Sequence, residues 1–293
     1  MATLRDIRRR IKAVQNTSQI TKAMKMVAAA KLRKAQARML DLRPYSGKIY
    51  QVLGNLSGVS EAEAHPLLVK RDTKAVEVVV LTSDRGLCGA FNANVLKAAA
   101  AFIKELRDKG LQVSVSAVGR KAQDYYKRRD VATRKMVTGI AGKIDYSHAK
   151  GLAADIMEGY VAGTFDEVYL VYNEFKNVVQ QVVRIVKLLP FEPEEQAAAP
   201  DAGADALTPY IFEPEAAELY KVLIPKAVEI KVFQAMLEYQ TSEEASRMTA
   251  MENASKNAKE MIQRMTLIAN KVRQASITRE LMDIVGGVEA LKK

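Results

Sequence analysis

The sequence predicts an α/β domain combined with a long antiparallel coiled coil. Helices from the two ends of the chain pair with each other, and a mostly parallel, Rossmann-like sheet lies between them in sequence. Heptad seams at both ends and alternating strand and helix patterns in the middle support this fold class. We therefore expect a coiled-coil helix over 1–57, a globular α/β domain over 70–209, and a segment over 210–293 that leads into the second coiled-coil helix.

The N-terminal helix carries a seam in which steps of three and four residues alternate. The seam is apolar at both ends and polar in the middle, and its positions are Leu4, Ile7, Ile11, Val14, Ser18, Thr21, Lys25, Ala28, Leu32, Ala35, Met39 and Leu42. We expect Pro44 to end or kink this helix, because proline lacks the backbone N–H that a helix interior uses.

The C-terminal helix has a matching seam of small and apolar residues. Its positions are Met248, Met251, Ser255, Ala258, Ile262, Met265, Ala269, Val272 and Ser276. Pro225 suits a first helical position, and the next proline or glycine is Gly286. Some 60 uninterrupted residues would form a rod of roughly 90 Å. A rod of that length needs a partner helix, which the N-terminal helix supplies if the chain doubles back.

Between the two helices, strand and helix patterns alternate, which predicts a mostly parallel sheet. The expected strands are 75–82, 112–119, 166–175 and 177–190, and the expected helices are 93–110, 121–127 and 147–162. Residues 192–209 are acidic and rich in Ala and Pro, as expected of a linker or loop.

The net charge of +11 is concentrated near the N-terminus. Residues 1–38 hold eleven Lys or Arg and one acid, Asp6, which gives +10. This charge predicts an acidic partner: nucleic acid, anionic lipid or an acidic protein surface. Nucleic acid is less favoured, because no aromatic residue precedes Tyr45 to stack on bases. Neither a signal peptide nor a membrane-spanning run is expected, and a single cysteine fits a reducing compartment.

The stretch SDRGLCGAFN (83–92) follows a strand at the place where α/β sheets bind ligands. It matches neither standard phosphate-binding motif, so we interpret it as a tight structural turn, with phosphate binding as the alternative. Cys88 is expected to be a buried, inert thiol, and the isolated His65 and His148 indicate no metal site. No catalytic motif is present, so we expect a non-enzymatic chain without a cofactor.

Three motifs closely resemble the γ subunits of bacterial F-type ATP synthases. They are VQNTSQITKAMKMVAAAKLRKAQ (14–36), TSDRGLCGAFN (82–92) and VRQASITRELMDIVGG (272–287), and they match in identity, order and spacing. The chain departs from the family pattern at Asp283 and Val288, which affects the fine contacts of the C-terminal tip. It also lacks the extra cysteine pair of light-regulated plastid members.

The resemblance implies a central rotor shaft at the cytoplasmic face of the bacterial plasma membrane, peripheral and without a membrane span. Rotation of the c-subunit ring would be transmitted by this shaft to the catalytic β subunits. The implied partners are the hexagonal ring of α and β subunits, the ε subunit and the c ring. Nucleic acid would not be a partner, and the catalytic sites would belong to the β subunits.

The resemblance also implies roles for individual residues. Contact with the α/β ring is implied for Met24, Lys25, Arg247, Arg273, Gln274, Thr278 and Glu280. An apolar tip suited to a hydrophobic sleeve is implied for Ile277, Leu281, Ile284, Val285 and Val288. Contact of the foot with the c ring and ε is implied for Tyr210 and Phe212.

Two alternatives to the shaft remain at this point. A basic, nucleic-acid-binding coiled coil predicts duplex affinity that falls steeply with salt. A Rossmann-type enzyme with helical arms predicts a saturable nucleotide site at residues 83–92.

Overall fold

The computed structural model describes residues 3–57, 65–129, 131, 133–140, 142–192 and 216–290. Two long helices dominate it, α1 (Leu4–Ser57) and α6 (Ala216–Ala290). The contacts divide the chain into two units. The coiled-coil unit comprises Met1–Ala28 with Met248–Lys293, and the α/β unit comprises Ala29–Arg247. None of the described helices is both long and apolar enough to cross a membrane.

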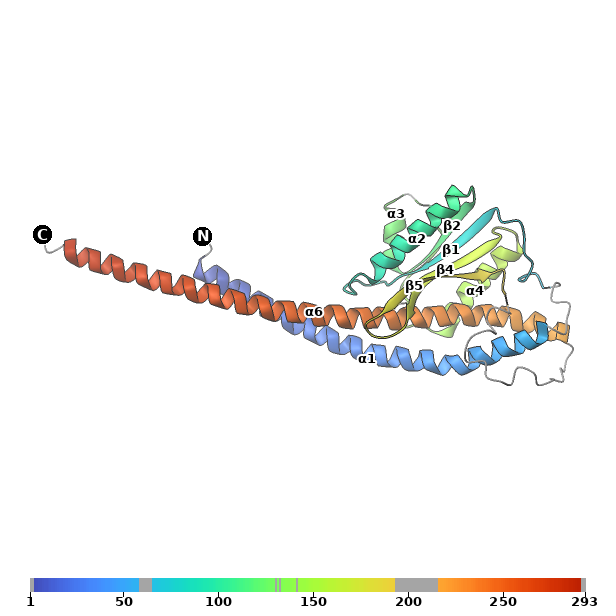
Figure 1. The fold of residues 1–293 in the computed structure, drawn as a ribbon, viewed down its shortest axis with the longest axis horizontal. Coiled ribbons are helices and arrows are strands. Elements are labelled where there is room, and N and C mark those ends of the chain that lie inside the picture. The colour runs from blue at the N-terminus through green and yellow to red at the C-terminus, as the bar shows by residue number, and fades with distance from the viewer. Residues whose placement is uncertain are drawn as a thin grey trace. The chain divides into compact units, whose positions relative to one another are not determined.

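The α/β unit contains a five-stranded sheet in the order β3-β2-β1-β4-β5 (Figure 1). Its strands are β1 (Ala75–Leu81), β2 (Gln112–Val118), β3 (Thr133–Val137), β4 (Glu167–Phe175) and β5 (Gln181–Leu189). The first four run parallel, and β5 is the antiparallel edge strand that returns from β4. The predicted Rossmann-like, mostly parallel sheet is therefore confirmed.

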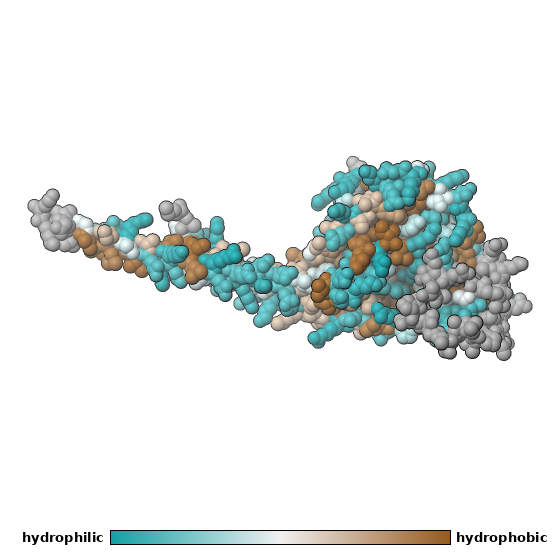
Figure 2. Space-filling model, viewed as in Figure 1, coloured by the Kyte–Doolittle hydropathy of each residue, from teal (hydrophilic) through white to brown (hydrophobic). Residues whose placement is uncertain are grey.

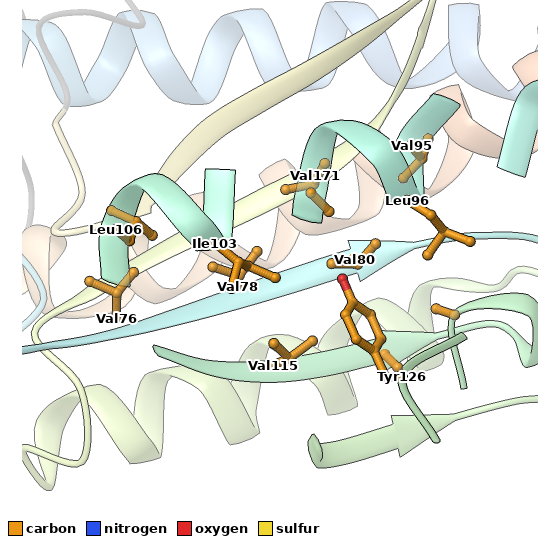
Figure 3. Packing of buried hydrophobic residues seen from close by; sticks show 13 residues of the cluster. Val76, Val78, Val80, Val95, Leu96, Ile103, Leu106, Val115, Tyr126 and Val171 are labelled. Carbon is orange, nitrogen blue, oxygen red and sulfur yellow. The ribbon is translucent and has the colours of Figure 1, made fainter. Parts of the chain in front are cut away.

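One face of the sheet is covered by α2 (Phe91–Asp108) and α3 (Arg120–Lys127). Alternate residues of a strand point to one face, so Val76, Val78 and Val80 of β1 enter the same core. Figure 3 shows Val76 below Leu106 and Val78 beside Ile103 of α2, and Val80 beside Tyr126 of α3. Every side chain of β1 after Ala75 is buried. This valine-rich strand therefore suits the central position in a sheet that is covered on both faces.

The opposite face holds a buried polar network. Glu77 of β1 is fully buried and accepts hydrogen bonds from the hydroxyls of Ser114 and Ser116. Arg134 of β3 completes the network: its Nε lies 3.2 Å from Glu77 Oε1, and its Nη2 lies 2.7 Å from Asp155 Oδ2. Asp155 belongs to α4 (Tyr146–Val161). The network therefore satisfies a buried carboxylate and anchors α4 to this face.

The middle of α6 packs against β4 and β5. Ser242 Oγ donates to the carbonyl of Asn173 at 3.1 Å, and Lys231 Nζ donates to the carbonyl of Lys187 at 2.9 Å. Tyr239 of α6 is almost fully buried beside them. This stretch of helix is therefore part of the core of the α/β unit.

The helices α1 and α6 pair antiparallel in each unit. In the coiled-coil unit, Lys25 Nζ lies 2.5 Å from Glu252 Oε1. In the α/β unit, Lys31 Nζ lies 3.9 Å from Glu244 Oε1, and the Tyr220 hydroxyl donates to the carbonyl of Leu53 at 3.3 Å. As residue numbers rise along α1 they fall along α6, which confirms the predicted antiparallel arrangement.

The heptad prediction also identified the contact faces. All twelve predicted seam positions of α1 are buried or half-buried. On α6, every predicted seam position from Met248 to Val272 is buried or half-buried, whereas Ser276 is exposed. The predicted seam therefore extends one position too far.

Both prolines lie inside helices, and the prediction that Pro225 begins one was wrong. Pro44 neither ends α1 nor bounds it, because the helix continues to Ser57. Pro225 lies inside α6, which begins at Ala216. The residues four positions earlier, Leu40 and Lys221, are both exposed. Water can therefore hydrate the carbonyl that each proline leaves without a partner.

Candidate functional site

The basic surface of the coiled-coil unit begins with a capped helix. Thr3 Oγ1 donates to Asp6 Oδ2 at 2.7 Å, and the Asp6 N–H donates back to Thr3 Oγ1 at 3.3 Å. The hydrogen bond from the Thr3 side chain lowers the pKa of Asp6. This carboxylate is committed to the helix N-terminus, while Arg8, Arg9 and Arg10 are exposed. The positive charge of this end is therefore available to an acidic partner.

Met24 and Lys25 lie at the middle of this surface, and both are half-buried against α6. Lys25 is already paired with Glu252, a partner that the sequence patterns did not reveal. Both side chains of the pair remain substantially exposed, at 38% and 54%. Contact of Met24 and Lys25 with another subunit stays a prediction.

Large apolar side chains also reach solvent in this unit. Figure 2 shows hydrophobic side chains among hydrophilic ones along the helices. Before the C-terminal end of α6, the exposed large apolar residues of this unit are Ile20, Met26, Val27, Met261, Leu267 and Ile268. Single exposed apolar residues are common on protein surfaces. Six along one pair of helices, beside a concentrated positive charge, are typical of a surface that meets other chains.

The α6 helix continues beyond the last paired seam position. Every residue from Arg273 to Gly287 is exposed, which includes the predicted contact residues Gln274, Thr278 and Glu280. Glu280 accepts a hydrogen bond from Ser276 Oγ at 3.1 Å within the helix. This single helical stretch makes no described contact with α1.

The predicted apolar tip lies within that stretch. Ile277, Leu281, Ile284 and Val285 are between 49% and 63% exposed. Val288 lies in α6, and its side chain is outside the described part of the chain. Tyr210 and Phe212, the predicted foot contacts, also lie outside the described residues. The side chains that the structure does describe leave an apolar helix end open to a partner.

Arg247 has a different environment from the other predicted contact residues. Only 9% of it is exposed, and its guanidinium lies 2.5 Å from Glu243 Oε1 and 3.1 Å from Glu244 Oε1. Burial alone would lower the pKa of Arg247, but the two carboxylates raise it. Little of the side chain is accessible to another subunit, so its contact with the ring stays a prediction. The spacing of the three residues, i,i+3 and i,i+4, was a signal for this cluster in the sequence.

The loop at residues 83–92 satisfies its own polar groups. Asp84 accepts the N–H of Arg120 at 2.9 Å and the N–H of Gly139 at 3.0 Å. The Asn92 amide donates to Ser83 Oγ at 2.7 Å, and its oxygen accepts the Ser83 N–H at 2.9 Å. Asp84 thus joins the loops that follow β1, β2 and β3, which favours the structural interpretation over phosphate binding.

Cys88 is a buried thiol beside this loop. Burial raises the pKa of Cys88, and a hydrogen bond with Ser83 opposes that effect in part. A thiol that stays protonated at neutral pH is a poor nucleophile. Among the described residues, no group of three or more His, Cys, Asp or Glu is arranged to hold a metal ion.

Comparisons with known proteins agree with this geometry. The sequence model of the family described as ATP synthase matches residues 3–291. The ATP synthase gamma chain of Geobacter sp. strain M21 is 48% identical over the full length of both chains. The corresponding chain of Pelotomaculum thermopropionicum is 46% identical, also over the full length of both.

Solved structures show the same fold. A chain in the central stalk/c-ring structure of Tetrahymena thermophila mitochondrial ATP synthase is 27% identical, with a TM-score of 0.61, and covers 80% of this chain and 99% of its own. A chain of the Euglena gracilis mitochondrial ATP synthase has a TM-score of 0.68 at 22% identity, and it covers 98% of this chain and 94% of its own. Because the sequence similarity extends along the whole length of its relatives, the chain belongs to the family of ATP synthase gamma chains.

Proposed function

We propose that this chain is the central rotor shaft of an F-type ATP synthase and a non-catalytic subunit of it. Rotation of a ring of c subunits turns the shaft, and the turning shaft changes the conformation of the catalytic β subunits. The α/β unit serves as the foot, next to the c ring and ε. The shaft is peripheral to the membrane, and we place it at the cytoplasmic face of a bacterial plasma membrane.

The apolar helix end is the single observation that carries this proposal. Five large apolar side chains of α6, from Ile277 to Val285, face solvent after the pairing with α1 has ended. A helix end that stayed in water would gain nothing from them, whereas an apolar sleeve formed by other subunits would bury them. A nucleic-acid-binding coiled coil has no use for such an end, so the shaft is the better supported function.

Removing the residues after Ser276 tests the shaft. We expect the purified chain to keep its thermal stability, since the only described side-chain contact that is lost is the hydrogen bond between Ser276 and Glu280. The yield and the melting temperature of the assembled catalytic complex should fall, because each apolar side chain contributes roughly 1.5–3 kcal/mol when it is fully buried. ATP hydrolysis per assembled complex should be measured beside the yield.

A full-length variant provides the matched control for this truncation. Replacing Ile277, Leu281, Met282, Ile284 and Val285 by Gln keeps the helix length and removes the apolar surface. It should reproduce the loss of yield. Normal yield with both variants would rule out the bearing role of this helix end.

Reversing the charge of Lys25 tests contact with an acidic ring. Lys25→Glu should lower the stability of the chain itself by no more than about 1 kcal/mol, because the pair with Glu252 is exposed. If the new carboxylate at position 25 lies roughly 4 Å from a carboxylate of an acidic loop, their repulsion reaches up to ~4 kcal/mol before screening, at an effective dielectric of about 20. We therefore expect ATP synthesis by the assembled variant to fall most at low salt.

The double variant Lys25→Glu with Glu252→Lys separates the two effects. It restores the pair within the chain but keeps a carboxylate at position 25. If ATP synthesis stays impaired in the double variant, this result would support contact between Lys25 and the ring. Complete recovery would instead show that Lys25 acts only through Glu252.

A further inference from the structure

A cavity of about 480 Å³ lies between α2 and α3, on the face of the sheet opposite α4. Its lining begins at the first turn of α2, near the carboxyl ends of the strands, where α/β sheets place their ligands. Neither the coiled-coil surface nor the apolar helix end includes any of its residues. The shaft function therefore leaves this cavity unexplained.

The cavity is lined by four cations and one acid. The cations are Lys97, Lys121, Arg128 and Arg129, and the acid is Asp124. Among the described residues, Lys97, Lys121 and Arg128 make no ion pair or side-chain hydrogen bond. A cluster of three unpaired cations around a cavity attracts an anion, because each cation lowers the potential energy of the same charge.

Three cations elsewhere in the α/β unit are each paired with a carboxylate. Arg184 Nε lies 2.7 Å from Glu174 Oε2, and Lys187 Nζ lies 2.7 Å from Glu167 Oε1. Lys135 Nζ lies 2.8 Å from Asp155 Oδ1. The cavity instead gathers three cations that have no such partner among the described residues.

The floor of the cavity is apolar. Its apolar lining residues are Ala93, Leu96 and Ala100 of α2, with Tyr125 of α3, and Asn92 lines it as well. The Arg129 guanidinium lies 3.7 Å from the centre of the Tyr125 ring, which holds that ring in place. An anion with an apolar, flat portion fits this combination better than a bare phosphate does.

The size of the cavity limits the kind of ligand. Its volume lies within the range of small-molecule sites, about 300–1,000 Å³. Lys and Arg bind phosphate oxygens through charge-assisted hydrogen bonds. We propose that this cavity binds a nucleoside polyphosphate, with its phosphates at Lys97, Lys121 and Arg128 and its base against Leu96 and Ala100.

Calorimetric titration of the purified full-length chain tests this proposal. The probes are ATP, pyrophosphate and a glutamate-rich peptide, all without magnesium and at an ionic strength of about 0.15 M. We expect ATP to bind at one saturable site, more tightly than pyrophosphate because its base adds apolar contact. Lys121→Gln with Arg128→Gln should weaken ATP binding by roughly tenfold or more, since two charge-assisted hydrogen bonds are lost.

The matched control is Lys104→Gln with Lys127→Gln. These exposed residues lie on the same two helices but outside the cavity, and the charge change is the same. The control should bind ATP within about twofold of the original chain, because distant exposed charges are screened. Equal weakening in both double variants, equal affinity for ATP and pyrophosphate, or tighter binding of the peptide would each overturn the proposal.

Discussion

Arg247→Met is expected to lower the free energy of unfolding by roughly 3–5 kcal/mol. The substitution keeps an unbranched side chain of similar length in α6 but removes the charge that two buried carboxylates share. Glu243 and Glu244 are only 3% and 4% exposed, so water cannot replace the guanidinium. Urea denaturation followed by circular dichroism gives the difference directly.

The loss of folding stability in Arg247→Met should depend on pH in a defined direction. Burial raises the pKa of Glu243, and Arg247 opposes that rise. Without Arg247, the folded-state pKa increases further above the ordinary value of 4.5. The folded variant then binds more protons than the unfolded chain, so its stability falls as pH rises above that value. The deficit should be smallest below pH 4.5 and larger at pH 7.

A triple variant provides the control for the buried cluster. Glu243→Gln and Glu244→Gln, combined with Arg247→Met, remove all three charges and should recover most of the lost stability. A deficit in Arg247→Met below about 1 kcal/mol at pH 7, with no dependence on pH, would show that the carboxylates are hydrated after all.

Gly119→Ala is the second substitution with a large expected effect, about 3–5 kcal/mol of destabilisation. Gly119 lies in the turn between β2 and α3 with φ of +94°, and an added Cβ would lie 2.0 Å from the carbonyl oxygen of Thr82. That oxygen belongs to the chain just after β1, so neither segment can move without disturbing the sheet. The same turn donates its N–H to Val137 at 2.8 Å.

Gly110→Ala is the matched control. Gly110 also has a positive φ, +82°, but nothing lies within 4 Å of an added Cβ. This substitution should cost only the backbone strain, about 1–2 kcal/mol. The difference between the two variants in urea denaturation measures the steric overlap alone. Equal losses would mean that the turn at Gly119 relaxes without cost.

The sequence predicted the coiled coil well because its contacts follow a period. Positions such as Leu32 and Ala258 repeat at the heptad spacing, and the buried face of each helix follows directly from it. The boundaries were harder to predict. The exposure of Ser276 depends on where the partner helix stops, and this is not encoded in the local pattern of α6.

Other misses came from short or polar segments. β3 was not predicted, because Thr133–Val137 reads TRKMV and alternates weakly along the edge of the sheet. Of the candidate contact residues, Lys25 and Arg247 already have partners within the chain. Glu252 approaches Lys25 from a helix 227 residues away, and no periodicity in one helix reveals such a pairing. The i,i+4 spacing of Glu243 and Arg247, by contrast, was visible in the sequence.

Pairing between the two ends of the chain has a consequence for biosynthesis. The α1 residues up to Ala28 pair with α6 residues after Met248, so the ribosome makes the two partners about 220 residues apart. At roughly 5–20 residues per second, the nascent N-terminal helix waits on the order of 10–40 seconds for its partner. During that time a basic segment is exposed beside the ribosomal RNA, with helicity that is marginal without tertiary contacts. The seam can close only when translation is nearly complete, well after all five strands of the sheet have been made.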